Sequence, residues 1–220
     1  MQVINLSENN SVLNQFLGEI RDVNIQRDPL RFRRNIERIG EMMAMEVSKH
    51  LHYEEHDVTT PLGTAVVSQI TDSVVLGTIL RAGLPLHQGF LNIFDRAENA
   101  FLSAYRRAGR VVDGKQELEI VAEYLAAPSL EGKTLILVDP MLATGMSMEV
   151  AYRALLSHGT PAHVHACCVI GTDTAVEYLQ QNLPEGVTLW CAAIDHVLNE
   201  KKYIVPGLGD AGDLCFGGKL

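Results

Sequence analysis

Short continuous apolar runs alternate with helical apolar stripes along most of the chain. The runs are rich in β-branched residues, which is typical of buried strands. They cover residues 73–80, 100–105, 135–138, 163–170 and 187–191. Helical character predicts helices at residues 86–93, 148–157 and 174–182. Strands that alternate with helices predict an α/β fold with a mainly parallel sheet and helices on both of its faces.

Three other segments carry local signals of their own. Asp28 followed by Pro29 is typical of a helix start, and the apolar positions that follow predict a helix through Glu46 or beyond. Residues 106–117 are polar and contain glycine, so we predict a mobile loop there and a returning strand at residues 119–125. The last ~20 residues are rich in glycine and lack periodicity, which predicts irregular structure.

The composition narrows the class of protein. A length of 220 residues fits one domain, and a hydrophobic content of 47% is enough for a sizeable core. No apolar run approaches the ~18 residues that suggest a membrane span, and the polar N-terminus has no signal sequence, so we expect a cytoplasmic protein without a membrane partner. The four cysteines lack CxxC spacing and are interpreted as reduced core thiols. A net charge of −9 argues against a nucleic-acid partner.

The most informative motif follows the apolar run 135–138. Asp139 stands at the end of that predicted strand, and a turn of small and hydroxyl residues, 143–147, leads into a predicted helix. Backbone N–H groups and the dipole at a helix start favour an anion, and Gly145 permits close approach of the backbone. Asp139 could order a ribose hydroxyl or the loop itself, or help to hold a magnesium ion. The pattern predicts a phosphate site.

Two further motifs are weak when each is taken alone. Arg81 and Gly83 follow another predicted strand, where a charged fork and an open backbone suit a diphosphate. Taken alone, a helix N-terminus with a surface arginine is the favoured interpretation of this motif. Residues 207–212 match GxGxxG, but only eight residues follow, which excludes the strand and helix of a dinucleotide-binding unit. The free N–H and C=O groups of such a loop can instead bind the edge of a flat base.

Taken together, these blocks resemble the uracil phosphoribosyltransferases. The matching segments are residues 79–84, 139–147 and 203–213, in the order of the family, within a resemblance that covers about 28–218. It implies a type I phosphoribosyltransferase fold, a mainly parallel sheet flanked by helices with a C-terminal base-binding hood. It also implies a single domain over 1–220, with a core at about 60–195 and a base-recognition loop at about 196–220.

The resemblance implies a reaction and a set of site residues. Uracil and 5-phosphoribosyl diphosphate (PRPP) would give UMP and diphosphate, with Arg81 and Asp139 in the catalytic role. The residues implied to contact PRPP are Arg81, Ala82, Gly83, Arg106, Asp139, Met141, Ala143, Thr144, Gly145, Met146 and Ser147. Those implied to contact uracil are Tyr203, Ile204, Gly209, Asp210 and Ala211. Mg²⁺ would bind mainly through PRPP rather than through a protein metal site. The resemblance also implies a homodimer or a higher homo-oligomer, and activation by GTP occurs in some members of the family.

Three departures from the family pattern leave other functions open. Met146 stands where glycine is usual, Leu214 stands where arginine is usual, and the segment 122–128 lacks an often-present lysine. A divergent homologue with weak or altered activity is therefore one alternative. A pyrimidine-sensing RNA-binding regulator on the same fold is another, although the acidic charge disfavours it.

Overall fold

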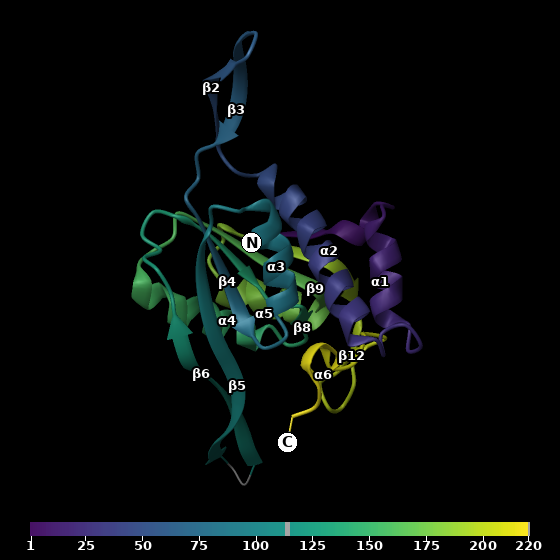
Figure 1. Ribbon diagram of the computed structural model, residues 1–220. Coiled ribbons are helices and arrows are strands. Elements are labelled where there is room, and N and C mark those ends of the chain that lie inside the picture. The colour runs from purple at the N-terminus through teal and green to yellow at the C-terminus, as the bar shows by residue number, and fades with distance from the viewer. Residues whose placement is uncertain (113–114, 220) are drawn as a thin grey trace.

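The computed structural model describes the backbone of residues 1–112 and 115–219, and the side chains of that part except for residues 104–122 (Figure 1). Its centre is an eight-stranded sheet in the order β1-β10-β9-β7-β4-β5-β6, with β8 beside β9. The strands are β1 Gln2–Asn5, β4 Val74–Leu80, β5 Glu98–Val112, β6 Lys115–Ala126, β7 Thr134–Val138, β8 Met141–Leu142, β9 His163–Thr172 and β10 Val187–Asp195. Neighbours pair in parallel except β5 with β6, which confirms the predicted mainly parallel sheet.

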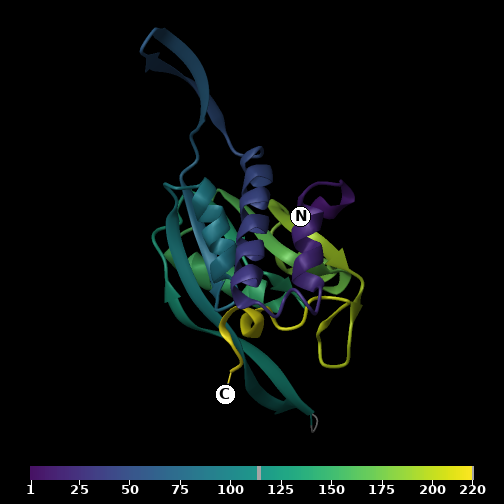
Figure 2. The same cartoon turned by 45° about the vertical axis from the view of Figure 1, so that its right-hand side comes forward.

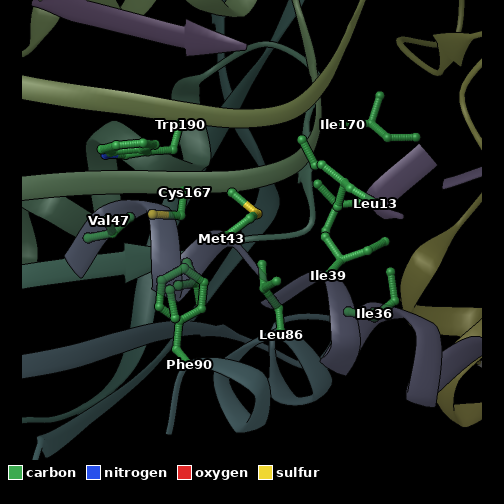
Figure 3. Close-up of a cluster of buried hydrophobic side chains, with 14 of the residues drawn as sticks. Leu13, Ile36, Ile39, Met43, Val47, Leu86, Phe90, Cys167, Ile170 and Trp190 are labelled. Atoms are coloured by element: carbon green, nitrogen blue, oxygen red, sulfur yellow. The ribbon is translucent and has the colours of Figure 1, made fainter. Parts of the chain in front are cut away.

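Helices cover both faces of the sheet, as the alternating pattern predicts (Figure 2). They are α1 Leu13–Arg21, α2 Pro29–Ser48, α3 Leu84–Ile93, α4 Met146–Leu155 and α5 Asp173–Asn182. Successive residues of β7 point to opposite faces: Ile136 joins the core under α1, α2 and α3, whereas Leu135 joins the core under α4 and α5. Figure 3 shows the first of these cores, where Met43 and Phe90 lie among side chains of the sheet.

The start of α2 shows how the local sequence sets an element. Asp28 is the N-cap, and its carboxylate accepts hydrogen bonds from the N–H groups of Leu30 and Arg31. Pro29 occupies the first turn, where its missing N–H costs nothing. The prediction of a helix from Asp28 onward is therefore confirmed, and Ile36 and Ile39 lie fully buried on its inner face.

Two predictions of irregular structure are wrong. Instead of a loop at 106–117, β5 runs to Val112 and β6 begins at Lys115, and the two form an antiparallel ribbon in which Arg106 lies opposite Ile120. The C-terminal stretch contains the strand pair β11 Val197–Leu198 and β12 Ile204–Val205, followed by the helix α6 Ala211–Phe216. Backbone hydrogen bonds stabilise strands and short helices even where the sequence has no periodic apolar residues. A polar or glycine-rich sequence therefore does not exclude these elements.

A two-stranded arm projects away from the sheet (Figures 1 and 2). It consists of β2 Tyr53–Thr60 and β3 Gly63–Ile70, which pair only with each other. Most of its side chains are exposed, and Leu62 at its tip is 99% exposed. Within the described part of the chain, no helix is long and apolar enough to cross a membrane.

Candidate active site

The site forms where β4 and β7 end side by side. These neighbouring parallel strands bring the turn after Leu80 and the turn after Val138 to the same edge of the sheet, where ligands bind in open α/β folds. The Leu80–Arg81 peptide is cis, and Gly83 donates its N–H to the carbonyl oxygen of Ile79 at 3.1 Å. The two turns that the sequence selects are therefore adjacent in space.

The second turn ends in a glycine that leads into α4. Gly145 precedes α4 with a φ of +79°, a left-handed conformation that favours glycine. A Cβ atom there would lie 2.9 Å from Cδ1 of Tyr178 and 3.1 Å from the carbonyl oxygen of Ala175. No side chain in the described residues caps this helix start, so the first N–H groups of α4 are left for another acceptor. Met146 is the first helical residue and has no positive φ, so this position does not require the glycine usual in the family.

Asp139 begins the same turn with an unusual carboxyl group. Burial raises the pKa of Asp139 to about 7, and the N–H of Met141, which donates to its Oδ1 at 3.3 Å, lowers the pKa only in part. The described residues provide no cation that compensates its charge. A carboxylate in this state favours a ligand that brings hydroxyl groups or a metal ion to it.

Replacing Asp139 with asparagine should make the protein more stable at high pH. The carboxyl binds its proton more tightly in the folded chain, where its pKa is about 7, than in the unfolded chain, where it is close to 3.8. Wild-type stability from this group therefore decreases as the pH rises from about 4 to 7. We expect Asp139→Asn to raise the free energy of unfolding at pH 8 by up to about 4 kcal/mol, with a difference that shrinks toward pH 4.

Urea unfolding of both proteins at pH 4.5, 6 and 8 measures this effect. Asp57→Asn, a change on the exposed arm, serves as the control and should leave the free energy of unfolding unchanged at each pH. A variant that is less stable than the wild type at pH 8 would contradict the assignment of Asp139 as a partly buried carboxyl without a compensating charge.

Arg81 points its guanidinium at the C-terminal segment. Its Nη2 lies 3.4 Å from Oδ1 of Asp213 and 3.2 Å from the carbonyl oxygen of Gly217. Its Nε is buried and has no hydrogen-bond partner among the described residues. Both side chains of the ion pair are about two-fifths exposed, so the pair itself contributes little stability. Arg81 therefore keeps donors for a ligand at the turn.

One pocket of about 580 Å³ unites the turns with the C-terminal segment. Of the residues that the sequence selects, those that line it are Ala82, Met141, Ala143, Ser147, Tyr203, Ile204, Gly209, Asp210 and Ala211. Arg81, Gly83, Asp139, Thr144, Gly145 and Met146 belong to the same turns but are not on its lining. The side chain of Arg106 lies outside the described residues.

The pocket also contains residues that the sequence analysis missed. Lys201, Lys202 and Lys219 line it beside Gly212. Lysines on both sides of a glycine-rich segment are unusual in a chain of net charge −9, and this pattern could have identified the three residues as site candidates from the sequence. Their positive charges suit the phosphate groups of a nucleotide.

Asp210 shapes the C-terminal wall of the pocket. It is the N-cap of α6, and its Oδ1 accepts the N–H of Asp213 at 3.0 Å. Arg33 of α2 holds the other end of α6 through a hydrogen bond of 2.6 Å from its Nη1 to the carbonyl oxygen of Cys215. The segment that the sequence predicts to be irregular is thus fixed over the end of β4.

The mainly parallel sheet with helices on both faces is the type I phosphoribosyltransferase fold, a fold of enzymes that transfer the phosphoribosyl group of PRPP. A family model described as uracil phosphoribosyltransferase matches residues 7–218. The chain therefore belongs to the uracil phosphoribosyltransferase family.

Individual relatives agree with this placement. A uracil phosphoribosyltransferase from Porphyromonas gingivalis is 54% identical over 220 residues, the full length of both chains. One from Methanothermobacter thermautotrophicus is 38% identical over 192 residues, which cover 86% of this chain and 85% of the relative. A solved structure of the AQ2163 protein from Aquifex aeolicus superposes with a TM-score of 0.86 at 29% identity, over 98% of each chain. The family and fold implied by the sequence motifs are confirmed.

Proposed function

We propose that this pocket converts uracil and PRPP to UMP and diphosphate in pyrimidine salvage. The observation that carries the proposal is the pocket itself, which is lined by residues of all three sequence blocks. The turn after β4, the turn after β7 and the C-terminal segment are distant along the chain, and the sheet brings them together. Their chemistry divides into diphosphate binding, phosphate and ribose binding, and base binding.

The diphosphate and phosphate ends of PRPP are assigned to the two turns. Arg81 acts on the diphosphate, whose negative charge grows as the bond to ribose breaks, with the backbone of Ala82 and Gly83 beside it. The 5′-phosphate is bound by the start of α4, through backbone N–H groups and the hydroxyls of Thr144 and Ser147. Positioning and electrostatic stabilisation of the leaving group then account for catalysis without a nucleophilic side chain.

Mg²⁺ fits the donor set of this site as a partner of the substrate. Mg²⁺ keeps much of its shell in water and phosphate oxygens and takes one or two carboxylates from the protein. Asp139, a carboxyl without a compensating cation, supplies such a group directly or through the ribose hydroxyls. When bound with PRPP, the ion supplies positive charge to the diphosphate.

Uracil is assigned to the C-terminal segment. Its edge presents acceptor, donor and acceptor groups in turn, which backbone N–H and C=O groups of Ile204 and Gly209 can match. Bases with the inverse pattern would leave buried polar groups unpaired, which is costly. Tyr203, Asp210 and Ala211 also line the pocket. We assign Tyr203 to the wall of the base site, and Asp210 and Ala211 to the neighbourhood of the base and ribose.

We propose that the protein is a homodimer or a higher homo-oligomer in the cytoplasm. An isolated two-stranded hairpin is marginally stable in water, and the arm exposes Leu62, Val66 and Val67, so a second copy of the chain is the partner we expect on it. All four cysteines are free thiols, which fits a reducing compartment. Sedimentation velocity of the full chain measures the oligomeric state.

The purified protein should convert radiolabelled uracil to UMP in the presence of PRPP and Mg²⁺. Activity should be lost with EDTA, and cytosine should not be converted, because its edge lacks the acceptor, donor, acceptor pattern. Orotate has the same edge as uracil with a carboxylate added at C6, so its conversion tests whether the pocket excludes that extra group. An otherwise identical assay with GTP tests the activation found in some family members. Retention of PRPP binding without conversion of any free pyrimidine would contradict the proposal and favour a divergent homologue.

The alternative function, a pyrimidine-sensing RNA-binding regulator, predicts RNA binding in place of enzymatic activity. It requires tight, salt-sensitive binding of pyrimidine-operon leader RNA, which a chain of net charge −9 disfavours. A filter-binding assay at 0.1 M salt should show no complex with the purified protein. Submicromolar binding together with an inactive enzyme would replace the proposed function by regulation.

A further inference from the structure

A second charged pair lies behind the base-binding segment, outside the pocket lining. Arg21, the last residue of α1, forms a two-pronged ion pair with Asp195, the last residue of β10. Nη1 lies 2.8 Å from Oδ2 and Nη2 lies 2.9 Å from Oδ1. This bidentate geometry is more specific than a single contact between charges.

The same pair holds both backbone groups of Gly207. The N–H of Gly207 donates to Oδ2 of Asp195 at 2.8 Å, and the carbonyl oxygen of Gly207 accepts from Nη1 of Arg21 at 3.0 Å. A peptide segment held at its N–H and at its C=O cannot rotate about its own axis without losing one of the bonds. The pair therefore sets the direction of the backbone at Gly207.

The environment makes these contacts strong. The Asp195 side chain is 8% exposed and that of Arg21 is 24% exposed, so solvent screens the pair little. Burial alone would raise the pKa of Asp195, but the hydrogen bonds from Arg21 and from Gly207 outweigh it and hold that pKa below its ordinary value. Asp195 therefore stays ionised and keeps its hold on the glycine at neutral pH.

Gly207 lies between the residues assigned to uracil. Ile204 precedes it and Gly209 follows it, and both line the pocket. Ile204 is held by burial and by the pairing of β12 with β11, whereas beyond β12 the burial of Leu208 is non-directional and leaves the orientation of the peptide groups open. Hydrogen bonding to a base edge requires that orientation to be set in advance.

We propose that Arg21 and Asp195 are positioning residues for uracil, which hold residues 204–209 in the conformation that binds the base. The inference rests on the proposed function, because it assumes that this segment binds uracil. It extends the site to the N-terminal helix α1, whose residue Arg21 lies 174 positions from Asp195 in the sequence. Neither residue touches the substrate in this assignment.

Arg21→Met tests the inference, with Arg31→Met as the matched control. Arg31 forms a similar bidentate pair with Glu19, a residue of α1, at 2.9 and 2.7 Å, and neither of these bonds is made to the C-terminal segment. We expect Arg21→Met to raise the KM for uracil about tenfold, with the Kd for PRPP within about twofold of wild type. Arg31→Met should leave both unchanged.

Two additional measurements separate positioning from folding. Thermal unfolding shows whether Arg21→Met is still folded. If it is not, Arg21→Lys replaces it in the test: this variant keeps the charge but not the two-pronged geometry, and should show a KM for uracil between those expected for the wild type and for Arg21→Met. Hydrogen exchange of residues 204–209 in the ligand-free protein should be faster in Arg21→Met than in the wild type and in Arg31→Met.

The outcomes discriminate the inference from the function on which it rests. Faster exchange with an unchanged KM for uracil, or a Kd for PRPP that rises with that KM, would overturn the inference. If the wild type itself fails to convert uracil, the proposed function is wrong. The positioning role of Arg21 and Asp195 is then judged on hydrogen exchange alone. Unchanged exchange overturns this role, and faster exchange in Arg21→Met supports the pair as the anchor of residues 204–209.

Discussion

Replacing Gly209 with valine should abolish uracil turnover while PRPP binding changes little. Gly209 has a φ of +96°, a conformation that a β-branched residue rarely adopts. A Cβ atom there would meet no atom within 4 Å, so the effect comes from the backbone and not from a clash in the core. The segment would have to change its conformation, and the N–H and C=O groups assigned to uracil would move with it.

Calorimetric titration of PRPP and of uracil in the presence of a PRPP analogue separates the two binding events in Gly209→Val. We expect uracil binding to weaken beyond detection, with the Kd for PRPP within about threefold of wild type, since the PRPP turns belong to other strands. Gly218→Val is a control in the same C-terminal region, because Gly218 has no positive φ and its added Cβ also meets open space. Equal weakening of both ligands in Gly209→Val would contradict the assignment of residues 203–213 to the base.

The central strands could be predicted because both faces of each are buried. In β4 and β7 nearly every residue is enclosed, so the apolar runs are continuous and their ends are sharp. The turns that follow them are then placed by topology alone, since adjacent parallel strands must present their carboxyl ends together. This is why the sequence alone could assign residues as far apart as Ala82 and Ser147 to one site.

Exposed strands carry no such pattern. β1 has only four residues at the edge of the sheet, and β2 and β3 form an arm with few buried side chains, so neither leaves an apolar period in the sequence. The sequence predicts the parts of β5 and β6 at residues 100–105 and 119–125, but the rest of their ribbon is stabilised by pairing between the two strands, and its polar sequence is equally typical of a loop. Such elements depend on partners that a local window of sequence does not contain.

The sequence analysis missed Arg21 and Asp195, the residues proposed to position the base-binding segment, for a related reason. Arg21 and Asp195 stand at the ends of two elements that are far apart in the chain, and each is an ordinary charged residue in its local context. Only the packing of α1 against the end of β10 turns them into a pair around Gly207. By contrast, the residues that meet the substrate lie in turns whose composition is itself unusual, which made them visible in the sequence.

Replacing Arg81 with alanine should lower kcat for UMP synthesis by about 10²–10³-fold, equivalent to roughly 3–4 kcal/mol of transition-state stabilisation. The guanidinium is assigned to the leaving diphosphate, where charge develops as the bond between ribose C1 and the diphosphate oxygen breaks and the bond from C1 to uracil forms. Loss of such a donor removes an interaction that is stronger in the transition state than in the bound substrate, so kcat should fall more than PRPP affinity. Arg34→Ala, which removes an exposed arginine paired with Glu37 on α2, should leave kcat unchanged.

Arg81 also holds the C-terminal segment, and a second variant separates that contact from the chemistry. Asp213→Asn weakens the 3.4 Å pair with Arg81 but leaves the arginine itself in place. Because this pair is long and exposed, we expect the rate of Asp213→Asn to stay within about threefold of wild type. Inhibition by added diphosphate should weaken in Arg81→Ala and not in Asp213→Asn. If the two variants lost activity equally, Arg81 would act by fixing α6 over the pocket and not by stabilising the leaving group.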